Sequence, residues 1–248
     1  NPEEIAAIVL EPTIYEKPSN IFLKKVREIA DKNNSLLILD EIVTGFRFDL
    51  MGAQKMFGIK GDLVCFGKGM GNGLPITAIT GPEEFMKVFD ELWVSSTNNS
   101  ESLSMAGTIA TINEMKTKKT IEHCWKMGTK LFEGWNKIAD ENNLNSKMIG
   151  YPIRMKLQCF DSKNNPSNDL KSLTIQEMIK KGIFMSPGVT FLSYSHTVQD
   201  IEFTLQSFND ICKNISNNIS ENQYHNHLEG NVPKTIWSMK IPPTKKHK

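Results

Sequence analysis

The first third of the chain places an acid and an amine directly after short apolar runs. Asp40 follows the aliphatic run 36–39, and Lys68 follows a second run and lies in a glycine-rich segment. Short apolar runs of this kind predict buried strands. Ligands of open α/β sheets bind at the carboxyl ends of the strands. The two side chains are therefore expected where a ligand would lie.

Each residue alone has a plainer explanation. Asp40 is equally consistent with a strand that ends in solvent, and Lys68 with a flexible turn. The glycines leave space for a bulky group on the amine. A phosphate loop does not fit, because Gly69 follows Lys68 where Ser or Thr is needed, and the glycines at every second position do not match GxGxxG. A nucleotide-binding α/β protein is thus a disfavoured alternative.

The acid and the amine together match the needs of pyridoxal phosphate. Lys68 could hold its aldehyde as a Schiff base, and Asp40 could keep the pyridine nitrogen protonated, so that the ring accepts electrons. Ile42, just past the acid, could cover one face of the ring. These residues predict pyridoxal phosphate as cofactor.

Three segments resemble the class III pyridoxal-phosphate aminotransferases. They are 11–47 with "DEIVTGFR", 52–81 with "FGKGMGNGLP", and 95–111. "GAQ" and "YSHTVQDIE" favour the branch that contains glutamate-1-semialdehyde aminomutase. The resemblance covers about residues 5–215.

The resemblance implies roles for four residues. Asp40 would pair with the pyridine nitrogen, Ile42 would pack on the ring, and Lys68 would form the Schiff base and then carry the proton. Thr97 would reach the cofactor phosphate of the partner subunit in a homodimer. Asparagines and Ser100 follow Thr97 where the family often has glycines. The family's phosphate-binding turn and ring-stacking aromatic residue precede residue 5 and are absent from this sequence.

The order of elements predicts an α/β fold: part of a fold-type I large domain over 1–117, with a mostly parallel sheet and helices on both faces. A small α+β domain is expected over 118–219, and a flexible tail over 220–248. The expected strands are 5–10, 36–39, 62–66, 76–80 and 153–160, with 184–194 extended. The expected helices are 20–34, 82–93, 103–115, 121–142, 173–181 and 198–215.

Composition narrows the class of protein. The chain has 248 residues, a net charge of +1 and four cysteines, and the cysteines form no CxxC pair. The chain is not strongly basic, so its charge gives no indication of nucleic-acid binding. No apolar run is long enough for a membrane span, and no spacing of residues suits a metal site. We expect a cytoplasmic enzyme that acts on small amine and keto or aldehyde substrates.

Two functional hypotheses lead. The first is an aminotransferase, or alternatively a glutamate-1-semialdehyde 2,1-aminomutase, and the second is a non-catalytic remnant of such an enzyme. The sequence starts at Asn1 rather than at a methionine, and it lacks the family's phosphate-binding turn. Both features lead us to expect a fragment that is inactive alone. We then expect an uncovered strand edge near 5–10 and weak binding of pyridoxal phosphate through Lys68.

Overall fold

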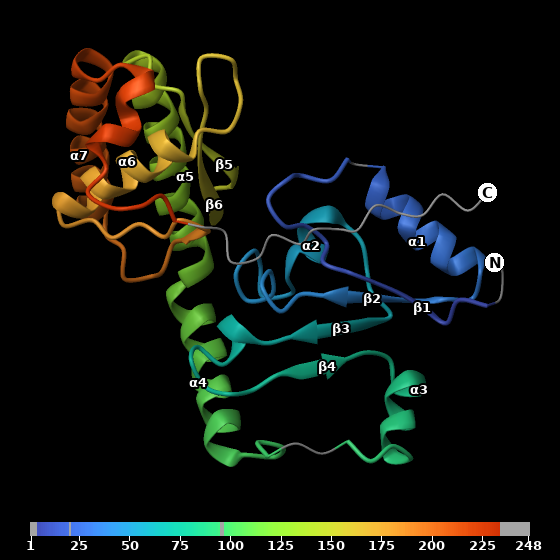
Figure 1. Cartoon of the computed structure of the whole chain (residues 1–248). Coiled ribbons are helices and arrows are strands. Elements are labelled where there is room, and N and C mark those ends of the chain that lie inside the picture. Colours follow the sequence, from blue (N-terminus) through green and yellow to red (C-terminus); the bar gives the residue numbers. More distant parts are fainter. Residues whose placement is uncertain (1–3, 20, 95–96, 234–248) are drawn as a thin grey trace, which may run out of the picture.

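The first part of the molecule is a four-stranded sheet with short helices (Figure 1). The computed structural model describes residues 4–19, 21–94 and 97–233. The strands, in spatial order, are β1 (Ala7–Leu10), β2 (Leu36–Asp40), β3 (Leu63–Phe66) and β4 (Ala78–Thr80). The first three are parallel, and β4 is antiparallel to β3. The expected α/β fold is confirmed, with one antiparallel strand.

The helices of this part are mostly short. They are α1 (Phe22–Lys32), α2 (Ala53–Phe57), the 3-10 helix η1 (Lys68–Met70), α3 (Glu83–Met86) and the 3-10 helix η2 (Lys87–Asp90). The single helix expected over 82–93 is therefore wrong. Neither α3 nor η2 contains a buried residue. Because a short helix depends on tertiary packing of an apolar face, this segment does not sustain regular α-helix.

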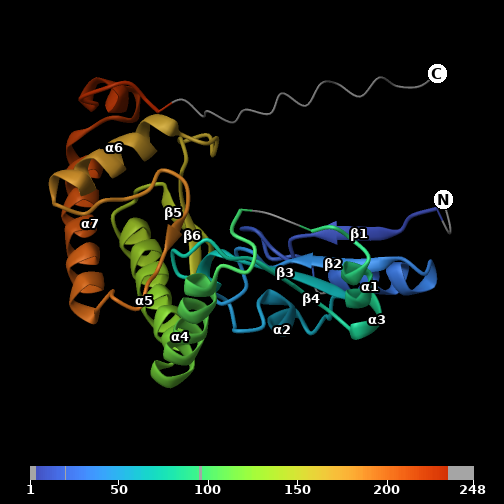
Figure 2. The same cartoon turned by 90° about the horizontal axis from the view of Figure 1, so that it is seen from below.

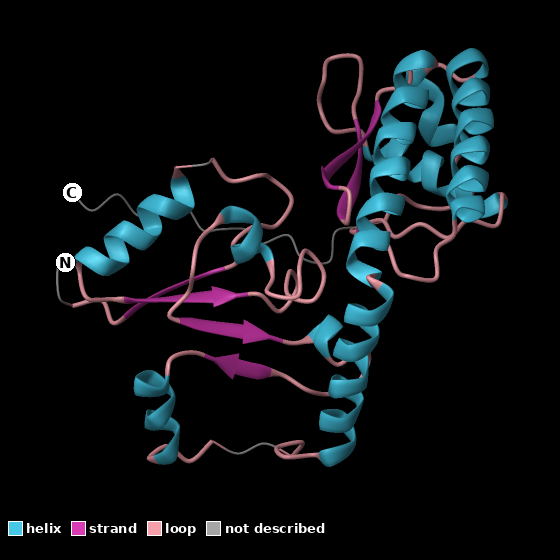
Figure 3. Ribbon diagram, turned by 180° about the vertical axis from the view of Figure 1, so that it is seen from behind, coloured by secondary structure: helices cyan, strands magenta, loops and turns pink. Residues whose placement is uncertain are grey.

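The second part of the molecule follows the first from residue 102 onward. It begins with a long helical column, formed by α4 (Ser102–Lys118) and α5 (Thr120–Glu141) (Figure 3). Only Lys119, with a left-handed φ of 51°, separates the two helices, so the break is shorter than the expected joint at 116–120. The remaining elements are β5 (Ser146–Tyr151), β6 (Arg154–Cys159), α6 (Asn168–Lys180), β7 (Thr190–Phe191), α7 (Val198–Asn218) and the 3-10 helix η3 (Glu221–His227).

The strands of the second part form an antiparallel sheet in the order β5-β6-β7. β5 was not predicted, because its sequence SKMIGY contains a glycine and few β-branched residues. Pairing along all of β6 compensates for this weak strand propensity.

The structure differs from the expected flexible tail over residues 220–233. Tyr224 and Leu228 pack against the core of the second part. The backbone N–H of Ser162 donates to Glu221 at 2.9 Å, and the Gln176 amide donates to the carbonyl of His227 at 2.9 Å. These contacts hold η3 in place. Residues 234–248 lie outside the described residues.

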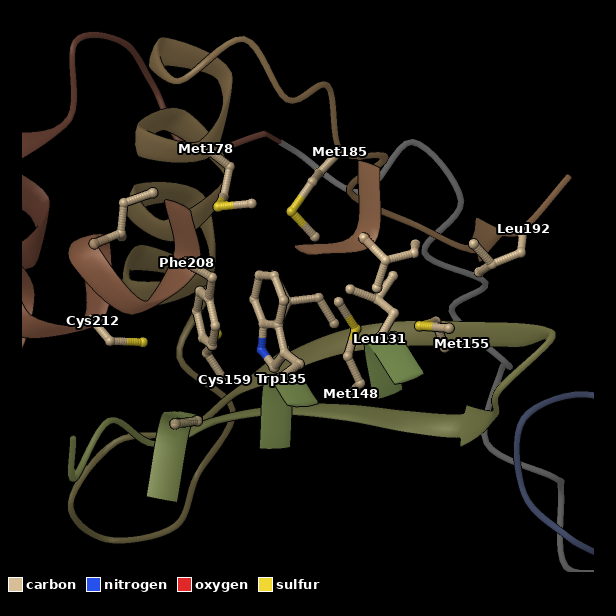
Figure 4. Packing of buried hydrophobic residues seen from close by; sticks show 14 of the residues in the cluster. Leu131, Trp135, Met148, Met155, Cys159, Met178, Met185, Leu192, Phe208 and Cys212 are labelled. Carbon is tan, nitrogen blue, oxygen red and sulfur yellow. The ribbon is translucent and has the colours of Figure 1, made fainter. Parts of the chain in front are cut away.

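The second part contains the larger apolar core. Trp135 stacks on Phe208 with ring centroids 3.4 Å apart, and methionines from the surrounding elements fill the space around them (Figure 4). The Trp135 indole N–H donates to Ser146 at 3.2 Å, so its polar atom is satisfied. The sheet of the first part buries a smaller cluster: Ala30, Leu37, Leu39 and Val64.

Two further features concern the described residues only. β1 pairs with β2 alone there, and Val9 on this edge strand is 65% exposed. None of the described helices has both the length and the apolar character needed to cross a membrane.

Candidate active site

The sheet register brings Asp40 and Lys68 to the same end of two neighbouring strands. Asp40 is the last residue of β2 and is opposite Cys65 of β3 in the parallel pairing. Lys68 follows β3 after Phe66 and Gly67 and begins η1. Both residues therefore lie at the carboxyl end of the parallel strands, where ligands bind in open α/β sheets.

Lys68 is held in a sparsely populated backbone conformation. Its φ is +46°, in the left-handed region that non-glycine residues seldom adopt. The side chain is exposed, and no hydrogen bond or ion pair engages its amine within the described ranges. Such strain costs on the order of 1 kcal/mol and is concentrated at functional sites. The turn thus fixes the backbone from which a free amine extends.

Asp40 has one oxygen occupied and one available. Its Oδ1 accepts a hydrogen bond from the backbone N–H of Ile42 at 3.0 Å, which fixes the half-buried carboxylate. No described group donates to Oδ2. Ile42 lies beside the segment that leads to Lys68, since a Cβ added to Gly67 would stand 3.6 Å from its Cγ2. The acid, the aliphatic side chain and the lysine are therefore grouped.

The neighbouring acid Glu41 has a structural role: its buried carboxylate holds the loop after β2 in place. Its side chain is fully buried and accepts hydrogen bonds from the backbone N–H groups of Ala53 at 2.8 Å and Gln54 at 2.7 Å, and from the Thr44 hydroxyl. A Cβ on Gly52, where φ is +86°, would lie 2.2 Å from Oε2. The carboxylate anchors the start of α2 and so fixes the loop after Asp40.

Burial raises the pKa of Glu41, and the hydrogen bonds from Thr44, Gln54 and Ala53 oppose this rise. Sequence reasoning missed this structural role, because no local pattern connects Glu41 with the distant residues 52–54. The acid pair at the end of β2 is thus divided between the candidate site and the framework.

The loop after β1 connects this end of the sheet to the β5–β6 hairpin. The hydroxyls of Thr13 and Tyr151 are 2.9 Å apart, and Arg154 donates to the carbonyl of Thr13 at 3.2 Å. Arg154 also lies 3.5 Å from the carboxylate of Glu11. These buried contacts were not predicted from the sequence, because they join positions far apart in the chain.

A cavity of about 640 Å³ opens beside η1. Its walls come from the loop containing Phe46 and Arg47, from Gly69 and Asn72, from the α4–α5 junction and from residues 192–195. Figure 2 shows α6 and α7 on the far side of the α4–α5 column from the sheet, and the β5–β6 hairpin on the near side. A cavity of this size suits a small-molecule ligand.

Thr97 is not grouped with the other candidate residues. It is exposed and lies in the turn before α4. In Figure 1 the segment that leads into α4 reaches that helix at its end away from β2 and β3. Its predicted contact, with the cofactor phosphate of a partner subunit, stays a prediction. No cluster of three or more potential metal ligands occurs among the residues described.

Comparison with known proteins defines the family. Residues 1–187 match the family aminotransferase class-III, and the chain belongs to that family. It is similar to glutamate-1-semialdehyde 2,1-aminomutase of Alkaliphilus oremlandii, with 35% identity in an alignment that covers 85% of this chain and 53% of that protein. Glutamate-1-semialdehyde 2,1-aminomutase 2 of Staphylococcus haemolyticus is 34% identical over 83% of this chain and 52% of its own length. The chain spans about half the length of the curated relatives it matches.

Solved structures support the same fold. A β-phenylalanine aminotransferase from Variovorax paradoxus matches with a TM-score of 0.75 and 24% identity, over 86% of this chain and 53% of that chain. An omega-transaminase from Sphaerobacter thermophilus gives 0.75 and 22%, over 85% and 52%.

Class III aminotransferases depend on pyridoxal phosphate. The residues present fit this cofactor in kind. Lys68 offers an unpaired amine, Asp40 an oxygen without a donor, and Ile42 an apolar surface next to them.

Proposed function

We propose that this chain serves the transfer of an amino group between a small amine and a keto or aldehyde acceptor, with pyridoxal phosphate held by Lys68. The observation that carries the proposal is the shared position of Asp40 and Lys68 at the carboxyl ends of adjacent parallel strands. Family membership supports it.

The residues would divide the work. When bound, pyridoxal phosphate supplies a ring that accepts electrons from the substrate's α-carbon. Asp40 would keep the ring nitrogen protonated through its free oxygen, and Ile42 would shield one face of the ring from water. The Lys68 amine would form the covalent link and, once released, take a proton from the α-carbon as a neutral base.

A direct test combines covalent labelling with one lysine variant. We expect added pyridoxal phosphate to change its absorbance on binding, and borohydride followed by peptide mapping to place the label on Lys68. Lys68→Ala should remove the label, while the control Lys60→Ala should keep it. A label on Lys60 or Lys87 would contradict the assignment.

The acid has its own test. Asp40→Asn should leave the label on Lys68 in place but abolish amino transfer, because an amide cannot hold the charged ring nitrogen. Normal transfer in that variant would show that Asp40 has another role.

A 2,1-aminomutase is the second candidate, and the relatives named as aminomutases favour it. The two reactions differ in whether the amino group is passed to a second substrate. Glutamate-1-semialdehyde with a ¹⁵N-labelled amine should keep its label in an aminomutase and exchange it with unlabelled donors in an aminotransferase.

We further propose a homodimer in the cytoplasm, in which Thr97 reaches the cofactor phosphate of the other subunit. Its four cysteines are free, which is typical of a reducing compartment. Mixing a Lys68→Ala chain with a Thr97→Ala chain tests the shared site, since activity should differ between mixed and parental dimers. Identical behaviour in every combination would contradict sharing.

A further inference from the structure

Arg47 stands at the wall of the cavity next to the Lys68 turn. It shares that wall with Gly69, which follows Lys68 directly in the chain, and with Asn72, four residues after Lys68. Lys68 itself is not part of the wall, but its neighbour Gly69 is, so the cavity borders the turn that carries the candidate covalent link.

The local structure fixes the guanidinium of Arg47 and leaves its outer nitrogens free. Its Nε donates to the carbonyl of Val43 at 3.2 Å, and its Cζ lies over the ring of Phe191, 4.0 Å from the centroid. No hydrogen bond or ion pair engages Nη1 or Nη2 in the part of the chain that the structure describes. The two N–H groups that form the guanidinium fork are available to a ligand.

The charge of Arg47 also lacks compensation among the described residues. The nearby Arg154 has Glu11 at 3.5 Å, and Glu114, the acid in the cavity wall, is paired with Lys118. Burial, and to a lesser degree the charge of Arg154, lower the pKa of Arg47. A partly buried cation without a counter-ion is unfavourable, and an anionic ligand would relieve that cost.

We propose that Arg47 binds the carboxylate of an organic acid substrate and thereby selects carboxylate-bearing amino or keto compounds over neutral ones. The inference rests on the proposed function of the same site. The planar fork of arginine matches the two oxygens of a carboxylate, which a lysine ammonium does not. Ser193, Tyr194 and Thr111 in the cavity wall supply hydroxyl groups for a polar ligand.

The test is direct binding to the folded chain, which needs no turnover. Glutarate and its neutral analogue glutaramide are titrated in parallel and followed by NMR. We expect the chain to bind glutarate at least about tenfold more tightly than glutaramide, as hydrogen bonds to charged groups imply. Arg47→Met should remove this preference, and Arg47→Lys should retain only part of it. Lys213→Met, which removes one positive charge from the exposed surface of α7 outside the cavity wall, should behave as wild type.

Two results would overturn the proposal. One is an unchanged glutarate preference in Arg47→Met, or in Arg47→Lys if the Met variant does not fold. The other is loss of pyridoxal phosphate labelling, but not of pyridoxal labelling, in Arg47→Met, which would assign Arg47 to the cofactor phosphate. If Lys68 is labelled normally and glutarate does not bind, the proposed function stands and this inference fails. If glutarate binds through Arg47 but Lys68 is never labelled, the proposed function fails instead.

Discussion

The two parts of the molecule are packed to very different degrees. In the second part, one cluster of buried apolar residues runs through α5, α6, α7 and the β5–β6 hairpin. The sheet of the first part and α1 bury a separate cluster of four residues and expose several others, including Val9, Ile29 and Ile79. Phe48 and Ala53 of the first part belong to the larger cluster. An open, mainly apolar hollow of about 820 Å³ also lies between α2 and the strands β3 and β4.

Because of this difference, the residues that stabilise the fold most and the candidate site residues lie in different parts of the molecule. Hydrophobic burial is the main favourable term in folding, so most of the free energy of folding should come from the second part. Asp40, Ile42 and Lys68 lie instead on the sparsely packed sheet. Substitutions in the second part should therefore change the free energy of unfolding most, whereas those at the sheet's carboxyl end should change chemistry with little loss of stability.

The largest effect on stability is expected from Trp135→Ala. Trp135 is fully buried and stacks on Phe208, so its removal leaves a large cavity. We expect a loss of roughly 3–5 kcal/mol in the free energy of unfolding, measured by urea denaturation. Trp135→Phe, which keeps an aromatic ring, should cost clearly less. A small loss in Trp135→Ala would show that this core does not dominate stability.

A matched pair of leucines compares the two cores directly. Leu157 in β6 and Leu39 in β2 are both essentially inaccessible, at 1% and 0% exposure. Leu157→Ala should cost roughly 2–5 kcal/mol, and Leu39→Ala about half as much, because fewer apolar neighbours surround the cavity it leaves. Urea denaturation of both variants measures the difference. Equal costs would remove the contrast between the two parts.

Glu41→Gln tests the framework of the candidate site. The carboxylate accepts hydrogen bonds from two backbone N–H groups, and a Gln amide would turn donors toward one of them. We expect a loss of roughly 1–3 kcal/mol near pH 5, the cost of leaving a buried donor unsatisfied. Denaturation at several pH values measures it.

The pH dependence gives this variant a second readout. Burial raises the folded-state pKa of Glu41 above its ordinary value of 4.5. The folded state therefore holds the proton more tightly than the unfolded state, and this contribution to stability is lost as pH rises from 4.5 through the folded-state pKa. The Gln variant lacks this titration, so its deficit against wild type should shrink over that window. A deficit that grows there would mean that the hydrogen bonds outweigh burial.

Local patterns in the sequence were enough for the parallel strands, the long helices and the grouping of Asp40, Ile42 and Lys68 at one end of the sheet. Each of these follows from runs of neighbouring residues and from general rules of sheet topology. The antiparallel direction of β4, the strand β5 and the packing of Tyr224 depend on distant partners. The same is true of the anchor at Glu41 and the contacts of Arg154, because a buried ion or hydrogen bond between remote segments leaves no periodic trace.

The smallest effect is expected at the start of α7, within the well-packed part. Thr197 and Asp200 form a capping box: the Thr197 hydroxyl accepts from the backbone N–H of Asp200 at 3.2 Å, and Asp200 accepts from the backbone N–H of Thr197 at 2.8 Å. Thr197→Ala should cost about 1 kcal/mol, because one N–H at the helix start loses its acceptor. Thr197→Ser keeps the hydroxyl and should cost much less.

Hydrogen exchange offers the sharper measurement, since protection should fall across α7 while labelling of Lys68 by pyridoxal phosphate stays unchanged. Loss of that labelling in Thr197→Ala would show that the two parts fold as a single cooperative unit, and that the separation of stability from chemistry does not hold.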